Sequence, residues 1–275
     1  MPSFRALLLF CLLCAPALAA EGVYVPNFWD PQRRLAKPDT TGLRAIRFLT
    51  EDDEPPFHFA LPDGSLAGFD VEIARAICDE LKLPCTVQAR RFDTLADALA
   101  SGQADAVIAG LAATPDLRTK LDFTAPYYKT PARFAARETS ALADALPETL
   151  AGKTVGVQDG SPHAAFLRAF FARTVLRGFE SREALRSALK RGEIDASFED
   201  GISLSFWLNG ADSERCCRFV GGPFTESRFF GEGFGIAVRK DAVPLRRALD
   251  FALARIAEKG VYTDLYLKYF PLGFW

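Results

Sequence analysis

Histidine is scarce in this sequence, and neither charge sign is in marked excess. The only histidines are His58 and His163. No spacing of histidine and cysteine resembles a metal site, so we expect no metal and no other cofactor. The formal net charge is −2. This balance gives no reason to expect nucleic acid or an anionic membrane surface as a partner.

Long hydrophobic runs are also lacking, which argues against a membrane span. The apolar run at residues 6–13 is short, follows a basic residue, and precedes the small-residue sequence at 17–19. This arrangement is typical of a secretory signal peptide. We therefore expect residues 1–20 to be a signal peptide, with cleavage after Ala19 or Ala20, and the remaining chain to be exported.

The four cysteines that follow this segment would enter an oxidising compartment, where disulfides persist. Cys78 ends a helical pattern and Cys85 begins the next strand, so we expect a disulfide between them. Adjacent cysteines pair only through a strained ring. The sequence therefore leaves three alternatives for Cys216 and Cys217: that ring, two free thiols or an intermolecular disulfide.

The body of the chain has the composition of a soluble globular protein, with 49% hydrophobic and 25% charged residues. Strand patterns alternate with helix patterns, which predicts mostly parallel sheets covered on both faces. We expect strands at 44–50, 86–90, 106–111, 154–157, 175–179, 194–198 and 234–238. We expect helices from Asp70 (as the cap) to Leu81, at 94–100, from Pro115, from Pro162, at 182–190 and over 243–269, divided at Gly260.

An internal repeat suggests two similar α/β lobes. Residues 98–106 match 188–196 in sequence: each closes a helix with glycine and enters a strand through Asp-Ala. We expect the chain to cross between lobes near 129–132 and 226–233. The predicted domains are an N-terminal arm (21–42), lobe one (43–130 plus 232–275) and lobe two (131–231).

The stretch from Asp105 to Tyr128 is expected to form one wall of a small-molecule cleft. Its buried apolar run is followed by Thr114, Pro115 and Asp116, the residue types that begin a helix. A helix start beside the end of a strand presents free backbone N–H groups, which favour an anion.

Six motifs occur in order along the chain. They are Pro55-Pro56-Phe57, residues 63–72 (DGSLAGFDVE), 92–95 (FDTL), 105–110 (DAVIAG) and 122–128 (DFTAPYY), and the return segment 231–240 (GEGFGIAVRK). Together they resemble the extracellular solute-binding proteins of ABC importers for polar amino acids, over about residues 43–270. This resemblance implies an α/β, two-lobed periplasmic-binding-protein type II fold with a hinge and an interlobe cleft. It also implies a periplasmic monomer that captures a small polar solute and delivers it to an ABC permease.

The resemblance also implies ligand-binding positions. These are Glu51, Phe92, Gly110, Ala112, Thr114, Arg118, Ser161, His163 and Asp200. Asp200 matches the acid that takes an α-ammonium, and Phe92 the aromatic residue that covers a side chain. The family's carboxylate-binding arginine is replaced by Leu117, with Arg118 one residue late. Ala109, Gly110 and Ala112 stand where relatives often carry hydroxyls, and Pro162 has no N–H to offer.

Two other classes of function remain as alternatives. The fold also resembles exported cyclohexadienyl dehydratases, in which Glu199 or Glu51 could act as a general acid. No nucleophile–base pair supports this, so we expect a protein that is not an enzyme. A partner or sensor module of another exported protein is the third class, suggested by the 21–42 arm and Cys216-Cys217.

Overall fold

The computed structural model describes residues 23–32, 34–111, 113–270 and 273–274. The expected signal peptide and Ala112 therefore lie outside the described residues. The described strands form two five-stranded sheets and one three-stranded sheet. The α/β fold class that the alternating strand and helix patterns predicted is therefore confirmed.

The first large sheet holds strands from both ends of the chain, and we call the part built on it lobe one. The order is β5 (Cys85–Ala89), β1 (Ile46–Thr50), β6 (Ala106–Val107), β13 (Ala237–Arg239) and β7 (Leu121–Phe123). β5, β1 and β6 are parallel, whereas β13 runs antiparallel to β6 and β7. Its helices are α1 (Phe69–Leu81), α2 (Phe92–Ala100), α3 (Pro115–Lys120), α8 (Val243–Glu258) and α9 (Val261–Tyr269). The small sheet β2 (Asp53–Glu54), β3 (His58–Ala60) and β4 (Leu66–Ala67) belongs to the same lobe.

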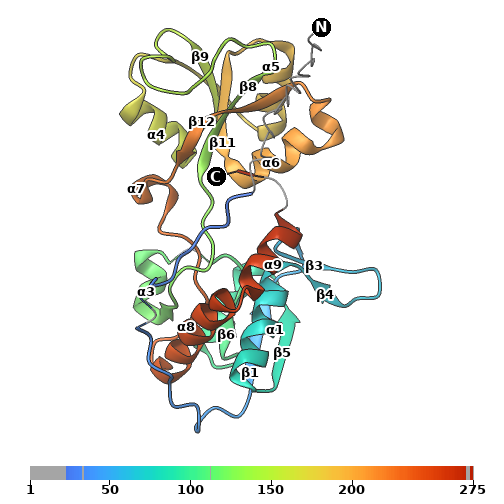
Figure 1. The fold of residues 1–275 in the computed structure, drawn as a ribbon, viewed down its shortest axis with the longest axis vertical. Coiled ribbons are helices and arrows are strands. Elements are labelled where there is room, and N and C mark those ends of the chain that lie inside the picture. The colour runs from blue at the N-terminus through green and yellow to red at the C-terminus, as the bar shows by residue number, and fades with distance from the viewer. Residues whose placement is uncertain (1–22, 33, 112, 271–272, 275) are drawn as a thin grey trace, which may run out of the picture.

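The second large sheet repeats this plan, and we call its part lobe two. The order is β10 (Val175–Phe179), β9 (Thr154–Gln158), β11 (Ala196–Asp200), β8 (Ala132–Arg137) and β12 (Cys217–Phe224). Its helices are α4 (Pro162–Phe170), α5 (Arg182–Arg191), α6 (Gly201–Asn209), the 3₁₀ turn η1 (Ala211–Ser213) and α7 (Ser227–Phe230). Figure 1 shows the two lobes stacked along the long axis of the molecule, with lobe two at the top.

The internal repeat has a physical basis that is the same in both lobes. Gly102 and Gly192 both adopt positive φ, 77° and 74°, where they close α2 and α5. Asp105 then accepts the backbone N–H of Arg47 at 2.9 Å, and Asp195 accepts that of Thr154 at 2.8 Å. Each aspartate thus joins the start of one strand to its parallel neighbour.

Two chain segments connect the lobes and lie side by side. Tyr127 N–H donates to Phe234 O, and Phe234 N–H donates to Tyr128 O, both at 2.9 Å. Such a paired crossing can absorb rotation of one lobe against the other through a few backbone angles.

The prediction that Asp70 caps α1 is wrong. Gly68 is the N-cap residue, and Asp70 lies in the first turn with its side chain fully buried. Its carboxylate instead accepts from Tyr127 Oη at 2.8 Å and lies 3.0 Å from His58 Nδ1. Two distant partners therefore take the side chain away from the helix end. The expected strand over 106–111 is also shorter, ending at Val107.

Several elements were not predicted: the strands β2, β7, β8 and β12, the helices α6 and α7, and the turn η1. The predictions of α3 and α4 were better, since Thr114 and Ser161 cap them as expected. Gly260 separates α8 from α9, also as expected.

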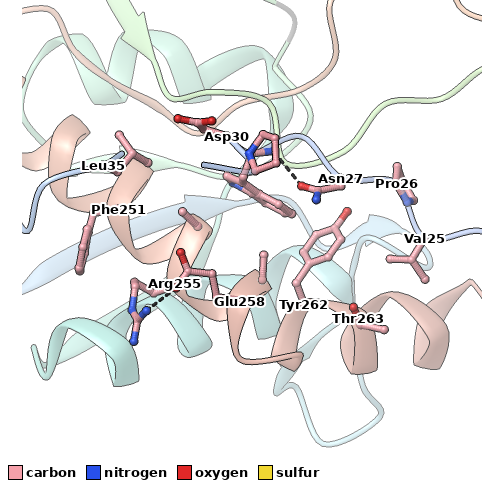
Figure 2. A pocket seen from close by; sticks show the side chains of 14 residues that line it. Val25, Pro26, Asn27, Asp30, Leu35, Phe251, Arg255, Glu258, Tyr262 and Thr263 are labelled. Atoms are coloured by element: carbon pink, nitrogen blue, oxygen red, sulfur yellow. Dashed lines mark hydrogen bonds and ion pairs between the residues drawn. The ribbon is translucent and has the colours of Figure 1, made fainter. Parts of the chain in front are cut away.

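The N-terminal arm packs on the last two helices through its aromatic residues. The Trp29 ring meets Tyr262 edge-on, with centroids 4.7 Å apart. A cavity of about 420 Å³ remains between the arm and α8 and α9. Figure 2 shows Asp30 and Leu35 on its arm side and Phe251 and Arg255 on its helix side.

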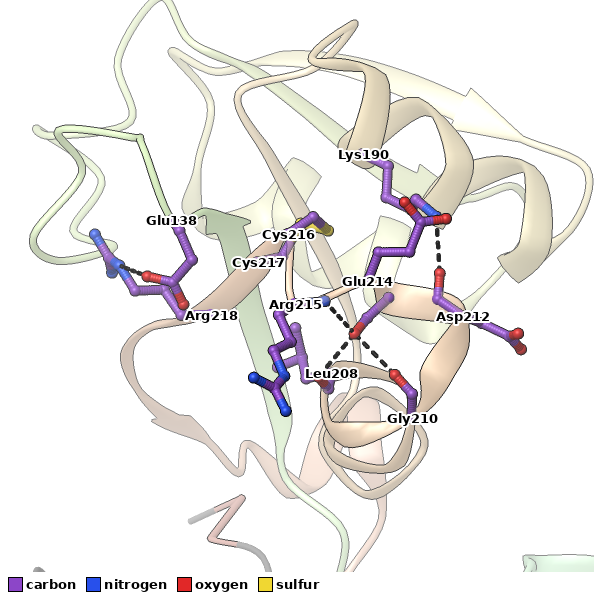
Figure 3. Close-up of a disulfide and its surroundings, with 11 residues drawn as sticks. Glu138, Lys190, Leu208, Gly210, Asp212, Glu214, Arg215, Cys216, Cys217 and Arg218 are labelled. Atoms are coloured by element: carbon purple, nitrogen blue, oxygen red, sulfur yellow. Dashed lines mark hydrogen bonds and ion pairs between the residues drawn. A yellow bond between two sulfur atoms is a disulfide. The ribbon is translucent and has the colours of Figure 1, made fainter.

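Both cysteine pairs are joined in the structure. The Cys78–Cys85 disulfide is present as expected and links the end of α1 to the start of β5. Cys216 and Cys217 form a disulfide between neighbours, the ring that the sequence left as one alternative. Figure 3 shows hydrogen bonds beside it, where Ser213 Oγ lies 2.9 Å from Leu208 O and accepts the N–H of Arg215 at 3.1 Å.

Two kinds of feature are missing from the described part of the chain. None of its helices combines the length and apolar character needed to cross a bilayer. No group of three or more histidine, cysteine, aspartate or glutamate side chains there is placed to hold a metal ion.

Candidate functional site

Two adjoining cavities lie where the crossing segments meet lobe one. We call the smaller one, of about 300 Å³, the acidic cavity; it is lined by Glu51, Glu54, Phe57, His58, Phe92, Ala109, Gly110, Tyr128 and Phe234. The larger one, of about 690 Å³, is the interlobe cavity. It is lined by Glu54–Phe57, Tyr128, Thr130, Arg182, Arg186, Asp200, Ile202, Ser203, Phe206, Trp207, Gly210, Asp212 and Phe234. The two cavities share the lining residues Glu54, Phe57, Tyr128 and Phe234.

Aromatic rings form a wall of the acidic cavity. Phe57, Tyr128 and Phe234 stack in a row, with both centroid separations 4.7 Å and interplanar angles of 28° and 18°. Gly110 lies beside this row at φ +64°, where an added Cβ would come within 3.3 Å of Tyr128 Oη. The predicted site residue Gly110 thus allows the chain to turn closely against the rings.

Two predicted site residues meet at the mouth of this cavity. Glu51 Oε1 accepts the backbone N–H of Phe92 at 3.2 Å. The Phe92 side chain is 44% exposed, unusual for a large aromatic residue in a cavity wall. The other oxygen of Glu51, Oε2, faces His58 Nε2 at 4.0 Å. The first turn of α2 therefore holds Glu51 in place through Oε1 and leaves Oε2 directed toward His58.

Asp200 lies in the interlobe cavity with both carboxylate oxygens engaged. Oδ1 accepts the N–H of Ser203 at 2.8 Å and caps α6, and Oδ2 accepts from the Thr130 hydroxyl. Thr130 belongs to the crossing segment. Asp200 is therefore oriented by its own helix start and by the connection between the lobes.

A buried ion pair stands behind Asp200. Arg186 donates to Glu199 Oε2 from Nε at 3.0 Å and from Nη2 at 2.7 Å, and Nη2 also reaches Ser203 Oγ at 2.8 Å. Burial raises the pKa of the Glu199 carboxyl, which the positive charge of Arg186 opposes. Arg182, one helical turn before Arg186, is exposed and lines the interlobe cavity.

Ser161 and His163 begin α4 and are not among the residues that line these two cavities. Ser161 Oγ accepts the N–H of Ala164 at 3.1 Å and so caps the helix. The His163 ring packs against Phe198 and Phe230. Burial lowers the pKa of His163 to about 4, which the charge of Asp200 opposes and that of Arg182 reinforces.

Thr114 and Arg118 are likewise not among the residues that line the two cavities. Thr114 Oγ1 accepts the N–H of Leu117 at 3.3 Å. Arg118 Nε donates to Ala113 O at 3.2 Å, and its guanidinium lies 5.5 Å from the centre of the Phe123 ring. Leu117 packs against the lobe-one core. In this conformation, the arginine is held against its own loop.

The structure thus groups Glu51, Phe92 and Gly110 around one cavity and places Asp200 in the other. Sequence reasoning did not single out the two arginines, the ring stack or His58. One signal was available: Arg182 and Arg186 are four residues apart, so they share a helix face, and they precede the strand that ends at Asp200. The ring stack joins residues far apart in sequence and left no local pattern.

Comparison with known proteins places the sequence in a family. The model of the bacterial extracellular solute-binding proteins, family 3, matches residues 46–272. The L-arginine-binding protein of Pseudomonas aeruginosa is 34% identical over 238 residues, covering 86% of this chain and 92% of that protein. ABC transporter arginine-binding protein 1 of Escherichia coli is 30% identical over 233 residues, covering 82% and 90%.

Other similar proteins are named as periplasmic proteins that bind arginine, histidine, or lysine, arginine and ornithine. The solved structure of the L-cystine solute receptor of Neisseria gonorrhoeae, unliganded and open, has a TM-score of 0.73. It is 19% identical, and the match covers 84% of this chain and 94% of that one, so it concerns the fold.

Proposed function

This chain belongs to the family 3 bacterial extracellular solute-binding proteins, and on that premise we propose that its solute is a small cation. The fold is the two-lobed type II fold of periplasmic binding proteins. The protein captures a small polar or charged solute between its lobes and delivers it to an ABC importer.

The lining of the acidic cavity carries this proposal. Two carboxylates, Glu51 and Glu54, stand beside the stacked rings and Phe92, and no lysine or arginine is among the residues that line this cavity. A cation over an aromatic face gains about 0.5–2 kcal/mol, more where water is excluded. A guanidinium or ammonium end is therefore stabilised here, and an anionic end is repelled. The named relatives bind arginine.

Arg182 is our candidate for the opposite end of the solute. It lines the interlobe cavity and is exposed, whereas the guanidinium of Arg186 is already paired with Glu199. A solute with a carboxylate can turn that group toward Arg182, which replaces the arginine missing at Leu117. Asp200 then faces an ammonium group. Glu51, Phe92, Gly110 and Asp200 are the predicted contacts that this pose uses.

The remaining features of the function are proposals of the same kind. We propose lobe boundaries at 43–130 with 232–275 and at 131–231, a monomer, and residence in the periplasm after loss of the signal peptide. We also propose that the chain is not an enzyme, since its relatives are binding proteins. Turnover of prephenate or arogenate by the purified protein would contradict this.

Titration calorimetry with four related solutes tests the proposed class. L-arginine and L-citrulline have nearly the same shape, but citrulline lacks the charge. We expect arginine to bind at least about 30-fold more tightly, which corresponds to about 2 kcal/mol. L-lysine is expected to bind as well. Equal affinities for arginine and citrulline, or binding of L-glutamate in preference to all of these, would overturn the proposal.

Agmatine, which is arginine without its carboxylate, tests the role of Arg182. The substitution Arg182→Ala should weaken arginine binding about tenfold and leave agmatine binding nearly unchanged. Arg168→Ala, at an exposed position on α4 away from both cavities, serves as the matched control. An equal loss for arginine and agmatine would show that Arg182 does not contact the carboxylate.

A further inference from the structure

The side chain of His58 is buried behind the acidic cavity and is fixed at one of its two nitrogens. It projects from β3 and is 4% exposed. Nδ1 lies 3.0 Å from Asp70 Oδ2, and Tyr127 Oη donates to Asp70 Oδ1 at 2.8 Å. Burial raises the pKa of the Asp70 carboxyl, which the hydrogen bonds with His58 and Tyr127 oppose. As a carboxylate, Asp70 only accepts hydrogen bonds. The geometry therefore assigns the Nδ1 proton to the bond with Asp70, and Nε2 is the nitrogen that faces the cavity.

Nε2 of His58 faces Oε2 of Glu51. The two atoms are 4.0 Å apart, beyond hydrogen-bond distance, while the other Glu51 oxygen is taken by the N–H of Phe92. A neutral Nε2 is an acceptor, and so is the carboxylate oxygen. Two acceptors at this separation leave room for one donor nitrogen about 2.9 Å from each.

We propose that His58 contacts the solute directly, so that Nε2 and Glu51 Oε2 together accept the N–H group of its cationic end. This contact makes and breaks no covalent bond. The inference rests on the proposed function, because it requires a cationic solute.

The groups that surround His58 favour a positive charge on the bound solute. Glu51 follows β1, Asp70 lies in α1, and Glu54 pairs with His58 across the β2–β3 strands. Tyr127 and Tyr128 are the nearby phenols; burial raises the pKa of both. Since basic side chains are absent from the lining of this cavity, a solute cation placed there meets no like charge from that lining.

The substitution His58→Asn separates this role from a structural one. The asparagine amide can donate to Asp70 in place of Nδ1 but leaves nothing at the position of Nε2. We expect the folded protein to be retained and L-arginine binding to weaken at least about tenfold. His58→Gln, whose longer amide can reach the Nε2 position, should recover part of this affinity.

A comparison of L-arginine with L-citrulline distinguishes a direct contact from a structural role. Loss of a contact at the cationic end should lower the preference for arginine over citrulline, whereas a structural defect should weaken both ligands alike. Unchanged arginine affinity in folded His58→Asn, or an unchanged preference for arginine over citrulline, would overturn the inference. If His58→Asn does not fold, the same preference measured in His58→Gln decides, and a value equal to that of the wild type overturns it.

Failure of the two proposals can be told apart. If the wild-type protein binds none of the basic solutes, the proposed solute class fails, and this inference fails with it. If arginine binds tightly, citrulline does not, and His58→Asn changes neither affinity, the solute class stands and only the role of His58 fails.

Discussion

Arg186 holds Glu199 through one carboxylate oxygen only. Nε and Nη2 donate to Oε2 at 3.0 and 2.7 Å, whereas Oε1 is buried and has no hydrogen-bond partner among the described residues. The side chain of Glu199 is 4% exposed. Removal of one member of such a pair leaves an uncompensated buried charge.

Glu199→Ala should therefore destabilise the protein strongly. We expect the free energy of unfolding to fall by about 3–5 kcal/mol, as measured by urea denaturation. Glu193→Ala is the matched control. Glu193 pairs with Arg191 and Arg177 at the surface, where solvent screens the charges, so its loss should cost far less than the loss of Glu199. Equal costs for the two substitutions would contradict the role assigned to burial.

The two disulfides should differ in their effect on stability. Cys78–Cys85 closes a loop with a sequence separation of 7, whereas Cys216–Cys217 joins neighbours. The chain-entropy relation gives about 2–3 kcal/mol for the first and only about 1 kcal/mol for the second, whose closed loop is minimal. Guanidinium unfolding of Cys78→Ser/Cys85→Ser and Cys216→Ser/Cys217→Ser measures both. A larger loss from the second pair would show that its ring stabilises the fold in another way.

Phe92→Ala should weaken solute binding without much effect on stability. Its ring is 44% exposed at the mouth of the acidic cavity, so truncation removes a contact for a cation and little core packing. A loss of about 0.5–2 kcal/mol corresponds to a dissociation constant raised roughly 2- to 30-fold. Phe170→Ala is the control, since Phe170 is 50% exposed and packs on Phe166 and Phe229 in lobe two. An unchanged affinity in Phe92→Ala would remove Phe92 from the site.

His163 should make stability depend on pH in a defined window. Burial lowers its pKa to about 4 in the folded protein, against about 6.5 in an unfolded chain. Between these values the unfolded state binds more protons, so stability rises with pH. The contribution is fully present above about pH 6.5 and is lost as the pH falls toward 4, with an upper limit of about 3 kcal/mol.

Urea denaturation at several pH values, with His163→Gln beside the wild type, measures this effect. The variant should lose the part of the slope that lies between about pH 4 and 6.5. If the two proteins have parallel stability curves across this window, His163 is not the group responsible.

The features of the fold that could be predicted from the sequence are those formed by residues adjacent in the chain. Thr114 and Ser161 cap helices because a hydroxyl, a proline and the free N–H groups of one helix end are adjacent in sequence. In contrast, α6 was missed because it is apolar on nearly every side and has no polar face to mark its period. The strand β12 was missed because Gly221, Gly222 and Pro223 have the composition of a turn.

The site could be predicted less well than the fold, because its contacts are formed between distant segments. Asp70 has the residue type of a helix cap, and the partners that draw it elsewhere are 12 and 57 residues away. Glu51 and Phe92 were each identified from resemblance, but the hydrogen bond that joins them spans 41 residues. The carboxylates of the acidic cavity were therefore visible in the sequence, whereas their common position was not.

The place of β13 between β6 and β7 sets an order for folding. The residues from 132 to 224, which build the whole sheet of lobe two, are synthesised before β13 is available. The sheet of lobe one can be completed only after these residues have been synthesised. The contact of Trp29 with Tyr262 on α9 forms later still, because Tyr262 follows β13 in the chain. Contacts of such long sequence separation form slowly. A chain that emerges from its N-terminus can thus assemble lobe two early, while lobe one closes last around the end of the chain.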